Sequence, residues 1–380
     1  MNILKEGFQK NSLDDDKKGR SSFWNIVLII LYVYLFLLSI DLMGEAFKQL
    51  GSDVARNIIL ATSDPFVSLF IGLLLTAVIQ SSSTSTAMIV AVVASGSMDF
   101  KDAVPMVMGA NIGTTLTSTI VSLGYITKSK EFRKAISAGT IHDIFNILVV
   151  ILLFPLELYY GFLSNLAQYI TNLITPDSLS QGTSLNFNLY ITKPATYAIA
   201  RLVSNTLVLV LLSFALLFFS IKFLSTEIYR RLIGNSKDQL RKYIFKSSYK
   251  SFFVGALLTA GVQSSSITTS LVVPLVATGK VSLKRSFPFI MGANLGTTIT
   301  ALLAAFFKSD AAISIAIAHL LFNMLGVLIF MPIPFIRSIP VILAGRFGRL
   351  TMHHRIIGFA YIIVIFFLLP FTLIYISRNL

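Results

Sequence analysis

Two copies of a short polar sequence carry the groups that are best suited to hold a small anion. Gln-Ser-Ser-Ser occurs at Gln80–Ser83 and again at Gln263–Ser266, and 31 residues after each glutamine stands an asparagine, Asn111 or Asn294. Each asparagine lies in a Gly-Ala-Asn-x-Gly-Thr-Thr sequence. Hydroxyl and amide groups donate hydrogen bonds to oxyanions. Because the two copies share their spacing, we predict one site built from two halves of the chain.

Each Gln-Ser-Ser-Ser string stands between two apolar stretches, so we expect it at the tip of a helical hairpin. A helix that begins there has free backbone N–H groups and a positive dipole end, which suit a tetrahedral oxyanion. Serine runs in membrane helices also serve for close packing alone, but a duplication at identical spacing favours a binding site. The predicted anion-binding residues are Ser81, Ser82, Ser83, Ser264, Ser265, Ser266, Asn111 and Asn294.

The composition indicates that the elements around these strings lie in a membrane. The 380 residues are 55% hydrophobic with a mean hydropathy of +0.79, and 13% are charged, whereas soluble domains carry about 25%. The absence of cysteine excludes disulfides and thiolate metal sites. The charged first 22 residues and the long apolar run after them do not resemble a cleavable signal peptide. Seven crossings are predicted, at residues 23–40, 104–125, 136–154, 202–221, 286–307, 311–330 and 356–376.

The net charge of +14 is unevenly distributed along the chain. Lysine and arginine concentrate in residues 126–134, 224–250, 280–285 and 331–355, while the segments 41–66, 97–103, 155–194 and 308–311 together hold nine acidic and five basic residues. An excess of basic residues marks cytoplasmic loops. This sorting accounts for the basicity without nucleic acid as a partner. It also predicts a cytoplasmic N-terminus and an outer C-terminus.

The same orientation predicts that two hairpins enter the membrane from opposite faces and return without crossing. We therefore expect an all-α integral membrane protein of two inverted-topology repeats, each with a re-entrant helical hairpin, with about seven crossings plus two hairpins. Residues 155–175 and 331–350 are expected to lie in the interface or to form short extra crossings. The predicted parts are a disordered cytoplasmic tail (1–22), repeat 1 (23–175, hairpin 66–96), an extracellular loop (176–194), repeat 2 (195–350, hairpin 250–279) and a last spanning helix (351–380).

Asp143 is the one acidic residue that this path puts inside the membrane. A carboxylate there is costly and marks an ion or proton pathway, or forms a structural pair with a neighbouring cation. Its counterpart in the second repeat is Leu320. One carboxylate among many hydroxyls favours Na⁺, with a proton as the alternative. The predicted sodium-binding residues are Asp143, Gln80, Gln263, Thr114, Thr115, Thr297 and Thr298. The histidines of the repeat, His142 and His319, are expected to bond neighbouring helices.

Several of these strings together resemble the type II sodium-dependent phosphate cotransporter family. They are residues 80–86, 108–114, 132–135 and 142–146, with Gln263–Ser266 and 291–298 in the second repeat. The resemblance covers roughly residues 20–376. It implies Na⁺-driven uptake of inorganic phosphate by alternating access, with Na⁺ as the co-transported ion and the bilayer as the surroundings. In that family an aspartate matching Asp143 is linked to electrogenic transport.

The chain departs from the animal members of that family, which carry a large extracellular loop with cysteines and continue through another spanning segment. These differences lead us to expect a multi-pass protein of a bacterial inner membrane. Alternatives are a transporter of another oxyanion such as sulfate, coupling to protons, and an anion channel. An enzyme is not expected, because Gly-x-Ser-x-Gly, the serine hydrolase signature, is absent around both serine runs.

Overall fold

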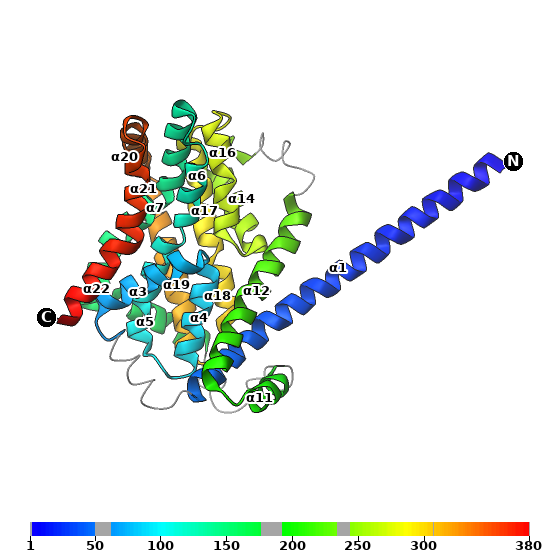
Figure 1. Cartoon of the computed structure of the whole chain (residues 1–380), viewed down its shortest axis with the longest axis horizontal. Helices are drawn as coiled ribbons and strands as arrows, with labels where there is room; N and C mark the ends of the chain where they lie inside the picture. Colours follow the sequence, from blue (N-terminus) through cyan, green and yellow to red (C-terminus); the bar gives the residue numbers. More distant parts are fainter. Residues whose placement is uncertain (1, 50–61, 176–191, 234–243, 307, 380) are drawn as a thin grey trace.

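The computed structural model describes residues 2–49, 62–175, 192–233, 244–306 and 308–379. Within these ranges every regular element is a helix, which confirms the predicted all-α class. The helices form a bundle, from which the start of the first helix projects (Figure 1). The predicted extracellular loop, 176–194, lies outside the described residues except for its last three.

Seven helical segments in the described part are long and apolar enough to cross a membrane, which is the predicted number. Two of them are interrupted at the threonines of the Gly-Ala-Asn-x-Gly-Thr-Thr sequences, as expected. The segments lie in α1 (Asn2–Gln49), α5–α6 (Phe100–Gly113 and Leu116–Leu123), α7 (Ser129–Tyr160), α12 (Thr206–Ile233), α17–α18 (Leu283–Gly296 and Thr298–Ala305), α19 (Asp310–Phe330) and α21–η1–α22 (Ile356–Ile363, Val364–Leu368 and Leu369–Asn379).

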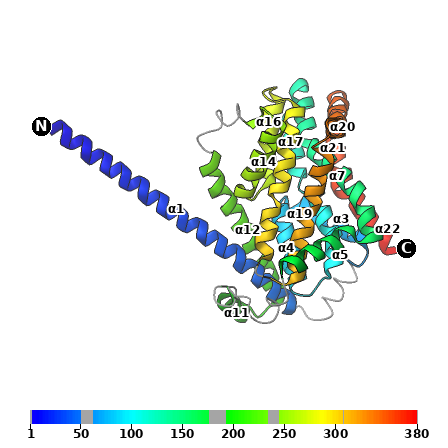
Figure 2. The ribbon, with the colours of Figure 1, turned by 180° about the vertical axis from the view of Figure 1, so that it is seen from behind.

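Helix α1 is longer than the sequence predicts. It includes residues 2–22, so the expectation of a disordered tail is wrong. Propagation of an existing helix costs far less free energy than its nucleation, so the apolar part of α1 can extend into the polar residues before it. The beginning of α1 points away from the bundle in two opposite views, and the helix packs against α12 (Figures 1 and 2).

Each predicted hairpin region contains helices separated at its Gln-Ser-Ser-Ser string. The first consists of α3 (Pro65–Ile79) and α4 (Ser82–Ala94), and the second of α14 (Ser248–Val262), α15 (Ser265–Ser270) and α16 (Val272–Ala277). Helix α3 begins with a proline after Asp64, whose carboxylate accepts from the N–H of Phe66 at 2.7 Å. In both views α3 and α4 lie toward the end of the bundle opposite to α14 and α16 (Figures 1 and 2).

Glycines allow each hairpin to contact the helix that follows it. A Cβ atom on Gly109 of α5 would lie 1.8 Å from the carbonyl oxygen of Leu69 in α3. The equivalent atom on Gly292 of α17 would lie 2.0 Å from the carbonyl oxygen of Phe252 in α14. Only glycine permits backbones to approach so closely. The same packing therefore occurs in both halves, 183 residues apart.

The predicted end of the spanning helix 136–154 is wrong, because α7 continues to Tyr160 with Pro155 inside it. A proline within a helix removes one backbone hydrogen bond, and here the helix tolerates the loss. It ends at Gly161, whose φ of 57° lies in the left-handed region. The carboxylate of Glu157 then accepts from the N–H of Leu163, at the start of α8 (Phe162–Ile174). The predicted interfacial segments correspond to α8 and to α20 (Pro334–His353), which pack against α19 and α7 respectively.

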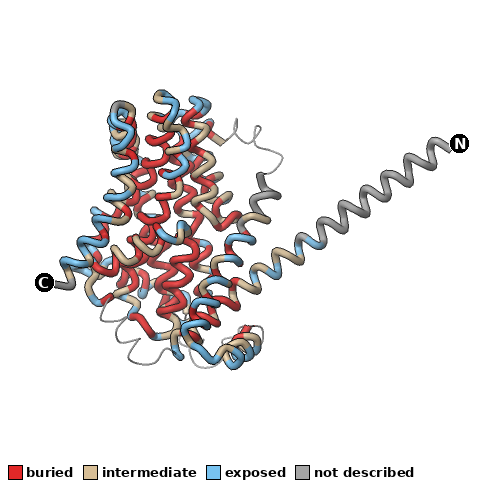
Figure 3. Tube along the Cα trace, viewed as in Figure 1, coloured by how far each residue is buried: buried red, intermediate tan, exposed pale blue. Residues whose placement is uncertain are grey.

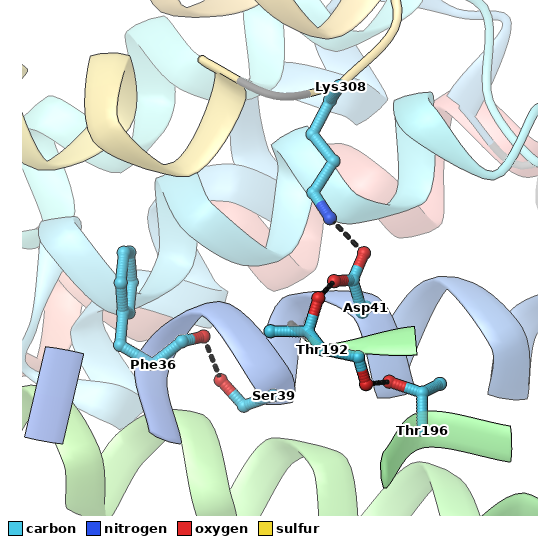
Figure 4. Close-up of polar contacts among 6 residues, drawn as sticks. All are labelled: Phe36, Ser39, Asp41, Thr192, Thr196 and Lys308. Carbon is cyan, nitrogen blue, oxygen red and sulfur yellow. Dashed lines mark hydrogen bonds and ion pairs between the residues drawn. The ribbon is translucent and has the colours of Figure 1, made fainter. Parts of the chain in front are cut away.

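A buried ion pair joins α1 to the second half of the chain (Figure 4). The ammonium of Lys308, just before α19, contacts the carboxylate of Asp41, and the hydroxyl of Thr192 donates to the same carboxylate. Thr192 precedes α11 (Lys193–Leu202). Burial lowers the pKa of Lys308 below its usual value, while Asp41 opposes that shift. Three segments far apart in sequence are thus held together at this end of α1.

Candidate functional site

The two Gln-Ser-Ser-Ser strings adopt the same unusual backbone geometry. Gln80 has a φ of 58° and Gln263 has a φ of 56°, and they are the only non-glycine residues with positive φ in the described part of the chain. A side chain in the left-handed region costs roughly 1 to 2 kcal/mol. Strained backbone of this kind concentrates at binding sites. The paired strain therefore favours a functional role for both turns.

The serine after each glutamine caps the next helix. The Oγ atom of Ser81 accepts from the N–H of Thr84 at 3.3 Å, and that of Ser264 accepts from the N–H of Ile267 at 3.3 Å. The N–H groups of the first residues in each helix have no acceptor within the helix itself. Ser82 is such a residue in α4 and is 4% exposed. The predicted helix starts are thus present at both strings.

The two turns contact each other in a reciprocal manner. The hydroxyl of Ser83 donates to the carbonyl oxygen of Gln263 at 2.9 Å, and the hydroxyl of Ser266 donates to the carbonyl oxygen of Gln80 at 3.3 Å. These residues are 180 and 186 positions apart in sequence. The structure thus brings the two predicted halves of the anion site together. Buried residues run through the middle of the bundle (Figure 3).

Asn111 and Asn294 lie in a buried network of amides and imidazoles. Asn294 Oδ1 is 3.0 Å from Nε2 of His142, and its Nδ2 donates to the side-chain oxygens of Asn146 and Asn323 at 3.0 and 2.8 Å. Asn111 Oδ1 is 3.3 Å from Nε2 of His319. Each histidine therefore forms a hydrogen bond to a helix of the other repeat, which agrees with the prediction that both bond neighbouring helices.

Asn146 connects the two repeats, because its Oδ1 accepts from Asn294 of the second repeat, while its Nδ2 donates to the backbone carbonyl of Asn111 in the first repeat at 2.6 Å. Both asparagines of the predicted anion site are consequently held by hydrogen bonds from the surrounding helices. Asn111 Nδ2 itself donates to the carbonyl of Val107 at 2.9 Å. The amide groups are thus fixed in orientation rather than free to rotate.

Asp143 is fully buried in α7. Its Oδ2 atom accepts from the hydroxyl of Thr119 at 2.9 Å and from the hydroxyl of Tyr361 at 3.2 Å. Its Oδ1 atom has no hydrogen-bond partner among the described residues, and the side chain of Thr115 lies beside the carboxylate. A salt bridge to Asp143 is absent from the same part of the chain. The alternative of a structural pair with a cation therefore has no support here.

The remaining predicted sodium-binding residues differ in their surroundings. Two buried oxygens, Oγ1 of Thr114 and Oε1 of Gln263, have no hydrogen-bond partner in the described ranges. The side chain of Gln80 is exposed. The hydroxyls of the other threonines, Thr115, Thr297 and Thr298, donate to backbone carbonyls three or four residues earlier, at the ends of α5 and α17. Among the described residues, no side-chain hydrogen bond joins these threonines to one another.

Some residues of the site were not among the predicted ones. Asn146 and Asn323 are separated by 177 residues, the same offset as the histidines, so their repetition was a signal for them. Thr119 lies one helical turn after Thr115, and nothing in the sequence singles it out. Tyr361 lies in the last spanning helix, outside both repeats. Repetition could not have identified it.

Comparison with known proteins agrees with the resemblance in the sequence. The family model described as Na⁺/Pi-cotransporter matches residues 35–171 and 216–377. The mouse sodium-dependent phosphate transport protein 2A is 30% identical over 91% of this chain, and the human sodium-dependent phosphate transport protein 2B is 28% identical over 94%. The chain spans 66% of the length of each of these relatives. No solved structure matches the chain significantly.

The two matched stretches contain both Gln-Ser-Ser-Ser turns, both asparagines and Asp143. They omit residues 172–215, which include the predicted loop between the two repeats. The family model thus covers well over half of the chain and every residue of the site described above. The chain therefore belongs to the Na⁺/Pi-cotransporter family.

Proposed function

We propose that this chain is a secondary transporter that moves inorganic phosphate together with Na⁺ across a membrane. The observation that carries the proposal is the reciprocal contact between the two Gln-Ser-Ser-Ser turns. Ser83 reaches Gln263 at 2.9 Å and Ser266 reaches Gln80 at 3.3 Å, so groups of both repeats face one place. Membership of the family supports phosphate and Na⁺ as the substrates.

Phosphate would be held by the hydroxyls and backbone N–H groups of the two serine runs, 81–83 and 264–266. The starts of α4 and of the α15–α16 segment supply free N–H groups and positive dipole ends. Asn111 donates one of its two amide N–H groups to Val107 and would offer the other to the anion, whereas Asn294, whose N–H groups both donate to Asn146 and Asn323, would offer one only by exchanging a partner. This donor set suits a tetrahedral oxyanion with several acceptor oxygens.

Na⁺ would bind to oxygens that lack a hydrogen-bond partner in the described residues. The buried candidates are Oδ1 of Asp143, Oε1 of Gln263 and Oγ1 of Thr114. Gln80, Thr115, Thr297 and Thr298 complete the proposed set. A cation near the serine turns would offset the charge of the bound anion and order the turns, which couples the two fluxes. Asp143 makes the transport electrogenic.

The repeats would be inverted, with the hairpins α3–α4 and α14–α16 entering a bacterial inner membrane from opposite faces. Three basic segments support this orientation, because Arg133 of α7, Ser282 before α17 and Arg349 of α20 line one cavity at a single end of the bundle. Basic segments gathered at one end fit a cytoplasmic face. Alternating access would then move the hairpins as a unit relative to the other helices.

The test is uptake of radiolabelled phosphate into proteoliposomes that contain the purified protein. We expect saturable uptake that is driven by an inward Na⁺ gradient. Uptake that persists unchanged when choline replaces Na⁺ would contradict Na⁺ coupling, and dependence on a pH gradient would indicate protons. Sulfate that competes as well as phosphate would overturn the choice of substrate. Flux that does not saturate would indicate an anion channel.

A further inference from the structure

A cavity of about 390 Å³ lies away from the serine turns, at the start of α7. Three elements line it: α7, the connection between α16 and α17, and α20. In Figures 1 and 2, α16 and α20 lie at the same end of the bundle. Ser137, the lining residue of α7 that is nearest in sequence to His142, precedes it by five residues, which is roughly 8 Å along a helix. The cavity is therefore separate from the asparagine and histidine network.

The charged groups around this cavity all carry the same sign. Arg133 and Lys134 come from α7, Arg349 comes from α20, and an acidic residue is absent from the lining. In the described part of the chain, the structure gives these three side chains no ion pair and no hydrogen bond. Like charges that share a cavity repel each other unless an anion lies between them. The cavity therefore has both the space and the uncompensated positive charge that an anion requires.

Backbone groups add to the positive potential. Ser282 and Leu283 line the cavity at the start of α17, a helix of 14 residues, and the Ser282 side chain makes no capping hydrogen bond. The first N–H groups of α17 and its dipole thus face the same space as the cations. Gly279 also lines the cavity, and a Cβ atom there would lie 3.1 Å from Nζ of Lys134. Because Gly279 has no side chain, the ammonium group of Lys134 can lie close to its backbone at the wall of the cavity.

We propose that this cavity binds a phosphate-type oxyanion, either free phosphate or the phosphate of an anionic lipid headgroup. Arg133 and Arg349, which lie on two helices that pack against each other, bind two of its oxygens, Lys134 contributes a third charge, and the start of α17 donates N–H groups. The cavity volume falls within the usual range of small-ligand sites, about 300 to 1,000 Å³. This site is distinct from the serine turns, and the proposal holds whichever anion the chain transports.

The experiment compares two double variants of the full chain in nanodiscs. Arg133→Gln with Arg349→Gln removes two cations from the cavity. Lys130→Gln with Arg346→Gln removes two cations from the same two helices outside it and serves as the control. Binding of radiolabelled phosphate is measured in phosphatidylcholine nanodiscs. Native mass spectrometry counts the phosphatidylglycerol retained from mixed nanodiscs. We expect the cavity variant to lose one of two bound phosphates per chain in the first assay, or about tenfold of the retained phosphatidylglycerol in the second, and the control to lose neither.

A loss of phosphate binding assigns free phosphate, and a loss of retained phosphatidylglycerol assigns the headgroup. Equal results for the cavity and control variants in both assays would overturn the proposal. Ser282→Asp is a second test in case the double variant misfolds. Aspartate is a favourable N-cap for α17, but it places a negative charge at the cavity. The Ser282→Asp variant should therefore keep the thermal stability of the wild type and show the same loss of bound ligand as the Arg133→Gln, Arg349→Gln variant. Unchanged binding by a stable Ser282→Asp variant would also overturn the proposal.

Discussion

The two halves of the central site share a backbone but differ in their side chains. The turns at Gln80 and Gln263 have φ angles within 2° of each other, and each turn receives a hydroxyl from the other. Position 143 carries an aspartate, whereas its counterpart is Leu320. Gln263 is buried, and Gln80 is exposed. The backbone frame that we propose for the anion is thus nearly symmetric, whereas the buried carboxylate belongs to one half alone among the described residues.

The difference extends to the asparagine network. The side chain of Asn294 meets three other side chains, those of His142, Asn146 and Asn323. The side chain of Asn111 meets one other side chain, that of His319, in the described residues. The second half therefore holds its asparagine more firmly, while the first half supplies the carboxylate. Four experiments test how far the halves are equivalent.

The largest effects are expected where each hairpin packs closely against the next helix, because both halves share this backbone packing. Gly109→Ala and Gly292→Ala should each destabilise the protein by roughly 3 kcal/mol or more, because the new methyl group would overlap a backbone carbonyl. Thermal unfolding of the purified protein measures the loss. Gly44→Ala is the control, since a Cβ atom there has nothing within 4 Å. A tolerated substitution in only one half would show that the packing is not shared.

Because position 143 carries an aspartate and its counterpart is Leu320, substitution in the first half alone should change the coupling between Na⁺ and phosphate. Asp143→Asn should raise the Na⁺ concentration for half-maximal uptake on the order of a hundredfold and lower the charge moved per phosphate by about one. The measurement is current together with uptake in proteoliposomes. Leu320→Asn, the matched control, should keep the wild-type ratio of charge to phosphate. An unaltered ratio in Asp143→Asn would refute the role of this carboxylate.

The asparagine network predicts unequal losses of stability. Asn294→Ala should cost about 2 to 3 kcal/mol and Asn111→Ala about 1 kcal/mol, because Asn294 leaves more buried partners without a hydrogen bond. Thermal unfolding of the two variants gives the difference directly. Asn323→Ala should fall between them, since Asn323 bonds both the side chain and the carbonyl of Asn294. Equal losses for Asn111 and Asn294 would contradict the asymmetry.

The smallest effects are expected at the reciprocal serine contacts. Ser83→Ala should cost about 1 kcal/mol and Ser266→Ala about 0.5 kcal/mol, because the bond of Ser266 is longer and its side chain less buried. Both variants should also weaken the binding of phosphate, measured as the concentration for half-maximal uptake. Ser95→Ala, at the far end of α4, is the control. A serine variant that binds phosphate like the wild type does not contact the anion.

Features that depend on local pattern or on repetition were predictable from the sequence. Hydropathy located the seven spans, and the recurring strings located both turns and both asparagines. Features that depend on tertiary contact were not. Tyr361 meets Asp143 across 218 residues and has no counterpart in the repeats. The end of α7 was misjudged because Pro155 normally stops a helix. Residues 2–22 were misjudged because their polar composition is typical of disorder.

The ion pair between Asp41 and Lys308 has a consequence for the order in which the protein assembles. The two residues are 267 positions apart, so synthesis of the intervening chain takes on the order of 10 to 50 s. During that time α1 has already emerged from the ribosome with its carboxylate unpaired. Insertion of the first helix and closure of the bundle are thus separate events, and closure waits for the second repeat. Exchange of Asp41 and Lys308 between the two positions would leave the pair intact but give the early helix the positive charge.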